Sequence, residues 1–307
     1  MTIVAQWSSV TKRYRGVTAV EGVSLGLEAG QVTALVGHNG AGKTTLIKLL
    51  LGLIRPTEGS VRISGIDPAG NRGAEARRAI GFLPESVAFH GAMTGSELMA
   101  FHARLKGESC RGNAALLERV GIAHAANRRV ATYSKGMRQR LGIAQALIGA
   151  PRLLLFDEPT SGLDPASRSD VYRMIDALRI GGATVLVCTH ALAEVQDRVD
   201  RAAIMHRGHL LAAGTLTDLR RGTAAEARIR VRVRPSAAEQ VLAGLPLGVR
   251  CAERDDASLA LEVAAGAKMP VLRALAQAGE LVEDVETSAP GLQEIYDGLV
   301  GATGEPA

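Results

Sequence analysis

The chain has 307 residues, a formal net charge of +5 and an apolar fraction of 47%, whereas aromatic residues make up only 3%. This length suffices for two domains, and the core must be built from aliphatic side chains, which suits a buried parallel sheet flanked by helices. No apolar stretch is long enough to span a bilayer, and residues 1–16 lack the apolar stretch of a signal peptide. We therefore expect a cytoplasmic chain without a membrane-spanning helix.

Strand and helix patterns alternate along the first 220 residues. Strands are predicted at 5–10, 18–27, 31–36, 60–63, 153–156, 184–188 and 202–205. Helices are predicted at about 42–53 and 165–179, and helical periodicity dominates residues 86–150. An α/β core with a helical insertion accounts for this order.

A glycine-rich loop lies between the strand at 31–36 and the helix that follows. Its residues are Gly37, His38, Asn39, Gly40, Ala41, Gly42, Lys43 and Thr44. Glycines let backbone N–H groups approach phosphate oxygens, and the helix N-terminus adds partial positive charge. The pattern predicts that Lys43 pairs with the β- and γ-phosphates of a nucleotide and that the Thr44 hydroxyl binds Mg²⁺. By itself the loop does not distinguish a kinase from a GTPase or a transport motor.

Two further segments are candidates for the same chemistry. Ser134 and Gly136 precede a helical pattern, where a small hydroxyl residue and a glycine can form an anion site. The apolar strand at 153–156 ends in Asp157 and Glu158. Such a strand delivers Asp157 to Mg²⁺, directly or through water. Glu158 then lies where a water can be aligned on the γ-phosphate, as general base or as water-orienting group.

The sequence changes character after residue 222. Residues 228–234 alternate arginine with β-branched residues, which predicts a strand with one arginine face. This face is either a solvated surface that resists edge pairing or a basic stripe for a phosphate-rich partner or a membrane. The predicted order that follows is βαββαβ, the ferredoxin-like pattern, with a last helix at 291–300. We expect a regulatory or docking domain at 223–307, after a domain at 1–222 whose helical subdomain spans about 86–150.

The motifs occur in the order and spacing of an ABC transporter ATPase, which the first 220 residues resemble. They are the loop at 37–44, the segment at 134–136, Asp157 with Glu158, the segment at 161–164, and Thr189 with His190. The resemblance implies a P-loop ATPase that binds and hydrolyses ATP with Mg²⁺. It also implies a head-to-tail dimer, in which each ATP lies between the loop of one copy and residues 134–136 of the other.

The resemblance assigns roles to individual residues. Glu158, His190 and Lys43 are the expected catalytic residues, with His190 on the γ-phosphate, and Thr44, Glu85 and Asp157 are the expected Mg²⁺ site. The expected nucleotide-binding residues are Tyr14, which stacks on adenine, then Gly37, His38, Asn39, Gly40, Ala41, Gly42, Lys43, Thr44, Thr45, Ser134, Lys135, Gly136 and Asp164.

Two positions depart from the family pattern. Glu85 stands where the family commonly has glutamine, and residues 133–137 read Tyr-Ser-Lys-Gly-Met instead of Leu-Ser-Gly-Gly-Gln. Both changes place charge near the shared γ-phosphate, negative at Glu85 and positive at Lys135. We hypothesise that the two charges partly offset each other in the closed dimer.

The implied partners are a second copy, an integral membrane permease contacted near residues 86–107, and, through that permease, a periplasmic maturation protein. The segments 83–89, 101–107 and 133–141 look most like the ATPase of the nitrous oxide reductase maturation transporter, which serves copper–sulfur centre assembly. The alternatives are another ABC exporter, for a drug, lipid or polysaccharide, and a soluble ABC ATPase acting on nucleic acid. We expect no nucleic-acid partner, because no coiled-coil insertion, zinc-binding cysteine group or second cassette is evident.

Overall fold

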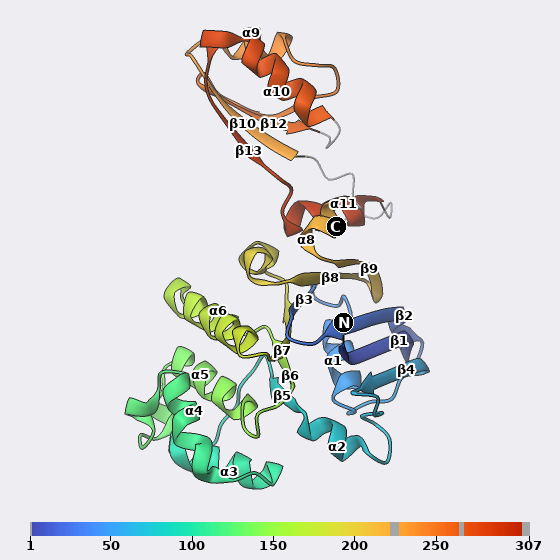
Figure 1. The fold of residues 1–307 in the computed structure, drawn as a ribbon, viewed down its shortest axis with the longest axis vertical. Coiled ribbons are helices and arrows are strands. Elements are labelled where there is room, and N and C mark those ends of the chain that lie inside the picture. Colours follow the sequence, from blue (N-terminus) through green and yellow to red (C-terminus); the bar gives the residue numbers. More distant parts are fainter. Residues whose placement is uncertain (1, 222–226, 264–266, 303–307) are drawn as a thin grey trace. The chain divides into compact units, whose positions relative to one another are not determined.

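The computed structural model describes residues 2–221, 227–263 and 267–302 and shows two compact units, Met1–Thr215 and Leu216–Ala307 (Figure 1). The expected domain boundary after residue 222 lies outside the described residues. The observed division falls earlier, because the short helix α8 (Leu216–Arg221) groups with the second unit.

A six-stranded sheet forms the centre of the first unit, in the order β5-β6-β7-β3-β8-β9. Its pairings are parallel except that of β8 with β9, which is antiparallel. The strands are β3 (Val32–Val36), β5 (Ile80–Leu83), β6 (Leu153–Asp157), β7 (Thr184–Thr189), β8 (Arg201–His206) and β9 (His209–Gly214). Every residue of β3, β6 and β7 is buried, as expected for aliphatic strands covered on both faces.

A three-stranded antiparallel sheet covers one side of this centre, in the order β2-β1-β4 (Figure 1). Its strands are β1 (Ile3–Tyr14), β2 (Val17–Glu28) and β4 (Glu58–Ile63), and helix α1 (Lys43–Leu50) packs with both sheets in one core cluster. The indole N–H of the fully buried Trp7 donates to the carbonyl of Leu46 at 3.3 Å. Strand β1 therefore supports the helix that follows the phosphate loop.

Helices cover the other side of the six-stranded sheet (Figure 1). The helical segment contains α3 (Gly95–Lys106), α4 (Asn113–Arg119) and α5 (Lys135–Ala146), and α6 (Pro165–Ile180) follows β6. Thr94 and Glu97 form a capping box at the start of α3, which fixes where that helix begins. The short helices α2 (Gly73–Arg78) and α7 (Leu192–Val195) complete the unit.

The second unit contains an antiparallel sheet in the order β11-β12-β10-β13. Its elements are α8, β10 (Ala227–Val233), α9 (Ala238–Ala243), β11 (Arg250–Arg254), β12 (Ser258–Val263), α10 (Lys268–Gln277), β13 (Val282–Ser288) and α11 (Leu292–Ala302). The order from β10 to β13 is βαββαβ, the element order of the ferredoxin-like pattern. One face of β10 is buried together with side chains of α9 and α10.

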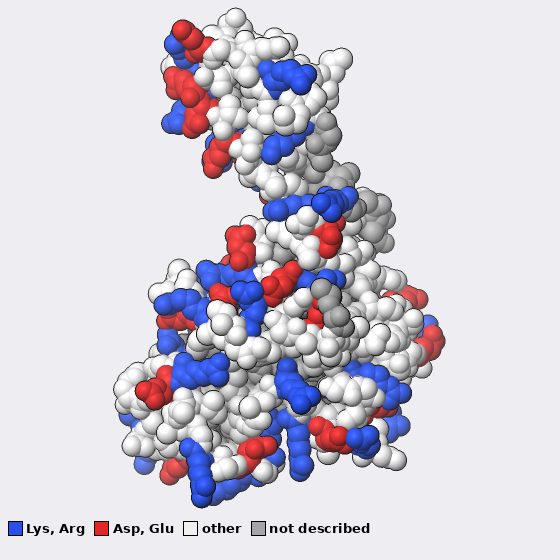
Figure 2. Space-filling model, viewed as in Figure 1, with Lys and Arg blue, Asp and Glu red and all other residues white. Residues whose placement is uncertain are grey.

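The arginine face of β10 is exposed and lies among acidic side chains. Arg232 contacts Asp284 at 2.7 Å, Arg228 contacts Glu294 at 3.2 Å, and Arg230 lies opposite Glu286 in the strand register. Figure 2 shows basic and acidic side chains side by side along one edge of this unit. These pairs favour a solvated face over a basic stripe that binds phosphates. The expected resistance to edge pairing is wrong, because β10 is paired on both sides, with β12 and β13.

Candidate functional site

The glycine-rich loop lies in the structure as a cradle between β3 and α1. Gly37 packs so closely against the Met205 carbonyl of β8 that a Cβ there would overlap it. Gly42 has φ 102°, in the left-handed region, and a Cβ there would lie 2.8 Å from the Ala19 carbonyl. Both close approaches require glycine. The same residues therefore keep the loop narrow and leave its backbone open to a bound anion.

Lys43 is 7% exposed, and its ammonium group donates to the carbonyl of Gly37 and, at 3.2 Å, to that of His38. The lysine thus folds back over its own loop. A nucleotide phosphate at this place offers the same ammonium a charged partner, and such charge-assisted hydrogen bonds are stronger than neutral ones.

Three carboxylates of the site face the loop. A pocket of about 380 Å³ is lined by Glu85, Asp157 and Glu158, by His190, and by residues 17–19, 38–45. Burial, and then the carboxylates of Glu158 and Glu85, raise the pKa of Asp157 to about 6, although Lys43 and Lys48 oppose this. Three carboxylates, Glu85, Asp157 and Glu158, therefore act on a site near only two lysines, Lys43 and Lys48.

This charge excess is suited to a divalent cation. No group of three or more His, Cys, Asp or Glu side chains in the described ranges could hold a metal by itself. Mg²⁺, however, usually binds one or two carboxylates together with phosphate oxygens and water. Asp157, Glu85 and the Thr44 hydroxyl line one pocket and match that donor set.

Glu158 is held in one orientation by the end of β7. It is 7% exposed and has φ 47°, a left-handed conformation that non-glycine residues seldom adopt. Its N–H donates to the Cys188 carbonyl at 2.9 Å, and the Thr189 hydroxyl donates to Oε2 at 3.3 Å. His190 Nδ1 lies 2.8 Å from Oε1. The strained turn at Glu158 thus points its carboxylate to the place where His190 meets the pocket.

Ser134, Lys135, Gly136 and Asp164 form a second group, which is not among the residues that line this pocket. Ser134 caps α5 by accepting from the N–H of Met137, and Asp164 caps α6 by accepting from the N–H and the hydroxyl of Ser167. Lys135 Nζ occupies the space that a Cβ on Gly162 would need. Within one chain, the two halves of the expected ATP site are therefore separate.

Two residues to which the sequence assigned no individual role, Gln139 and the motif residue Thr189, hold the turn that carries Glu158. Gln139 is 7% exposed, and its side-chain amide donates to the carbonyl of Pro159 at 2.8 Å, which joins α5 to the turn after Glu158. Thr189 is fully buried and holds Glu158 as described above. The position of Thr189, directly before His190 at the end of a strand, indicates in the sequence that it lies at the site. The contact of Gln139 with the Pro159 carbonyl depends on tertiary packing and has no such indication.

Tyr14 lies at the end of β1, outside the residues that line the pocket. It is 42% exposed, and the Lys12 ammonium lies 5.0 Å from its ring centroid. Its strand partner Val17 does line the pocket. Tyr14 is therefore paired with a residue of the pocket lining, and its side chain is partly exposed.

Comparison with known proteins agrees with this arrangement. A family model described as ABC transporter matches residues 20–161. The daunorubicin/doxorubicin resistance ATP-binding protein DrrA of Streptomyces peucetius is 35% identical over 312 residues, covering 100% of this chain and 94% of that protein. The bacitracin transport ATP-binding protein BcrA of Bacillus licheniformis is 37% identical over 214 residues, 69% of each protein. A solved structure described as the ATP-binding subunit of an ABC transporter has a TM-score of 0.66 and 30% identity, covering 72% of this chain and 93% of that one.

The fold and the pocket thus define a P-loop nucleotide-binding protein. The chain belongs to the ABC transporter family, as its ATP-binding and ATP-hydrolysing subunit. Proteins of this family work as dimers with a membrane permease. Within the described part of the chain, no helix is sufficiently long and apolar to cross a membrane.

Proposed function

We propose that two copies of this chain hydrolyse ATP in two shared sites, at the inner face of the cell membrane, and so drive export through a separate permease. The observation that supports this best is the division of the expected site residues. The loop, Asp157, Glu158 and His190 line one pocket, whereas Ser134 and Gly136 are absent from its lining. A second copy in head-to-tail orientation supplies the missing half.

Each residue of the pocket has its own role in ATP binding or hydrolysis. Lys43 and the loop N–H groups bind the phosphates. Thr44, Asp157 and Glu85 would hold Mg²⁺, whose charge would offset that of the phosphates. Glu158 accepts a proton from the attacking water or aligns it. His190, held against Glu158, donates a hydrogen bond to the γ-phosphate. Ser134, Lys135 and Gly136 of the second copy close the site over that phosphate.

A permease contact near residues 86–107 is supported by an apolar pair on α3. Phe101 is 48% exposed and Leu105 is 69% exposed, and they lie four residues apart on one helix face. Exposed large apolar side chains in a cluster are typical of protein interfaces. This pair is the surface that we assign to the permease.

The transported species has two candidates. Relatives that match the chain along nearly its full length are named for daunorubicin resistance, which supports a drug-type exporter. The segments 83–89, 101–107 and 133–141 support the second candidate, the nitrous oxide reductase maturation transporter, with a periplasmic maturation protein reached through the permease. Deleting the gene separates them: the first predicts sensitivity to an exported drug, and the second predicts nitrous oxide reductase lacking copper.

The Glu158→Gln variant tests the ATPase mechanism directly. The amide keeps the size of the side chain but cannot accept a proton, so hydrolysis should slow by about 100-fold or more. Unhydrolysed ATP should then hold two copies together, which light scattering coupled to size exclusion measures. A variant that stays monomeric with Mg²⁺ and ATP, or that turns over ATP at the parental rate, contradicts the proposal.

A further inference from the structure

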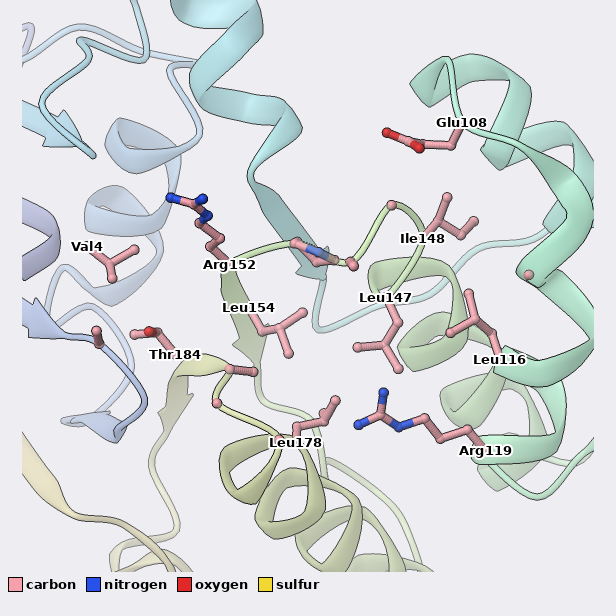
Figure 3. Close-up of a pocket in the computed structure, with 18 of the residues that line it drawn as sticks. Val4, Glu108, Leu116, Arg119, Leu147, Ile148, Arg152, Leu154, Leu178 and Thr184 are labelled. Atoms are coloured by element: carbon pink, nitrogen blue, oxygen red, sulfur yellow. The ribbon is translucent and has the colours of Figure 1, made fainter.

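A second, larger cleft lies at the opposite end of the ATPase unit's strands. Its volume is about 1190 Å³, and its lining includes residues 147–152, the starts of β1 and β7, helix α4 and the end of α6 (Figure 3). Ligand sites for small molecules commonly have volumes of about 300–1000 Å³. The cleft therefore has room for a drug-sized molecule.

The walls of the cleft are apolar. In Figure 3, Leu116 and Leu147 lie to the right of Leu154, and Leu178 lies below them. These side chains come from α4, from the segment after α5, from β6 and from α6. Leu154 is fully buried, whereas Leu116 is partly exposed. Leu147 and Leu178 are 7% and 4% exposed, so an apolar body in the cleft would contact mainly α4, the segment after α5 and α6.

Two arginines and one amide are among the polar groups that line the cleft. Arg119 and Arg152 line it, both are exposed, and neither has an ion-pair or hydrogen-bond partner for its side chain among the described residues. Arg119 reaches across to Gly181 at the end of α6. Asn113 also lines the cleft; it is 8% exposed, and its side-chain amide has no hydrogen-bond partner in the part of the chain that the structure describes.

The polar groups match a ligand with an acidic group. Asn113, Leu116 and Arg119 lie three residues apart and so share one face of α4. The Asn113 amide has no hydrogen-bond partner among the described residues, so its donors and acceptor are open to a ligand in the cleft. Glu108 also lines the cleft, but in Figure 3 it lies at a different corner from Arg119. An anion beside Arg119 therefore avoids that carboxylate.

The cleft is joined to the ATP site by four elements. Strand β6 runs from the cleft to Asp157, and β7 runs from Thr184 in the cleft to Thr189 beside Glu158. Helix α5 runs from Ser134 to Leu147, and α6 runs from Asp164 to Gly181. Each element has a nucleotide-site residue at one end and a cleft residue at the other. Along β6, the distance from the cleft residue Arg152 to Asp157 is only about 15 Å.

We propose that this cleft binds a small amphipathic organic anion, and that its occupancy changes the rate of ATP turnover. The acidic group pairs with Arg119 and the Asn113 amide, while the apolar body packs on the leucines. Because the ligand bridges α4 to α6 and to residues 147–152 before β6, it favours one arrangement of the helical segment relative to the sheet. A shift of β6 or α5 also moves the nucleotide-site residue at the other end of that element, which is Asp157 for β6 and Ser134 for α5.

Binding is tested with 8-anilinonaphthalene-1-sulfonate, an aromatic amphipathic anion whose fluorescence rises in apolar sites. Arg119→Gln should weaken its binding to the full chain by about tenfold, the loss expected for one charge-assisted contact. Arg111→Gln is the matched control, since Arg111 is exposed just before α4 but does not line the cleft. Decanoate should displace the probe, and decylamine should not. Equal binding by both variants, or equal displacement by decylamine, overturns the proposal.

A separate measurement tests whether a ligand in the cleft changes the ATPase rate. Decanoate should change the ATPase rate of the parent and of Arg111→Gln, whereas Arg119→Gln should keep its basal rate and lose the response. A parent that binds the probe in the cleft but shows no change in ATPase rate overturns the coupling. Leu116→Glu gives a second variant, because a carboxylate on the same face of α4 should repel the anion.

Discussion

Replacing Asp157 by asparagine should stabilise the nucleotide-free protein at neutral pH while abolishing Mg²⁺-dependent hydrolysis. Burial and the neighbouring carboxylates raise the pKa of Asp157 from 3.8 to about 6 in the folded state. A raised pKa means that the folded state prefers the protonated acid. Its contribution to stability is therefore complete below about pH 4 and is lost as the pH rises through about 6.

The size of the expected change in the free energy of unfolding follows from the difference between the folded and unfolded pKa values of Asp157. One pKa unit corresponds to about 1.4 kcal/mol, so the full difference corresponds to about 3 kcal/mol. Because the pocket is open to water, screening reduces this value, and we expect Asp157→Asn to be about 1–2 kcal/mol more stable than the parent at pH 8. The two proteins should converge at about pH 4, where Asp157 is protonated in both the folded and unfolded states.

The assay is denaturant unfolding followed by tryptophan fluorescence. Trp7 is the single tryptophan of the chain and is fully buried in the first unit, so its fluorescence reports on that unit. Asp164→Asn is a control of opposite sign, because hydrogen bonds from Ser167 lower the pKa of Asp164. A parent that is more stable than Asp157→Asn at pH 8, or a stability difference that does not change with pH, refutes the reasoning.

Two further predictions concern the dimer and the permease. In a double-mutant cycle on the ATPase rate, Glu85→Gln and Lys135→Gly should show a coupling above about 0.5 kcal/mol, and purely additive effects would mean that the two charges do not meet. Phe101→Ser with Leu105→Ser should abolish co-purification with the permease while leaving the ATPase rate of the isolated chain unchanged. Unchanged co-purification would exclude this face of α3 as the contact.

Much of the fold could be predicted from local patterns. The buried aliphatic strands β3, β6 and β7 and the alternating strand β10 follow directly from hydrophobic periodicity. Helix α2 was not predicted, because among its six residues Gly73–Arg78 only Gly73 and Ala76 are buried, which leaves no apolar periodicity to detect. Strand β9 (His209–Gly214) was also not predicted.

The candidate site was less fully predictable. Motif order identified Lys43, Asp157, Glu158 and His190, which the structure brings into one pocket. The left-handed backbone at Glu158 and the Gln139 contact with the Pro159 carbonyl depend on how β7 and α5 pack, which no local pattern encodes. For the same reason, the cleft beside α4 was not expected, since its lining combines residues far apart in the sequence.

The central claim is that each ATP site is shared by two copies, and mixing two inactive variants tests it most directly. Lys43→Ala destroys the loop half of every site, and Ser134→Arg destroys the other half. Alone, each variant should be inactive. In a mixed head-to-tail dimer one site pairs the intact loop of one copy with the intact segment 134–136 of the other, so mixing should restore ATP hydrolysis. If the mixture stays as inactive as its components, the shared-site account is wrong.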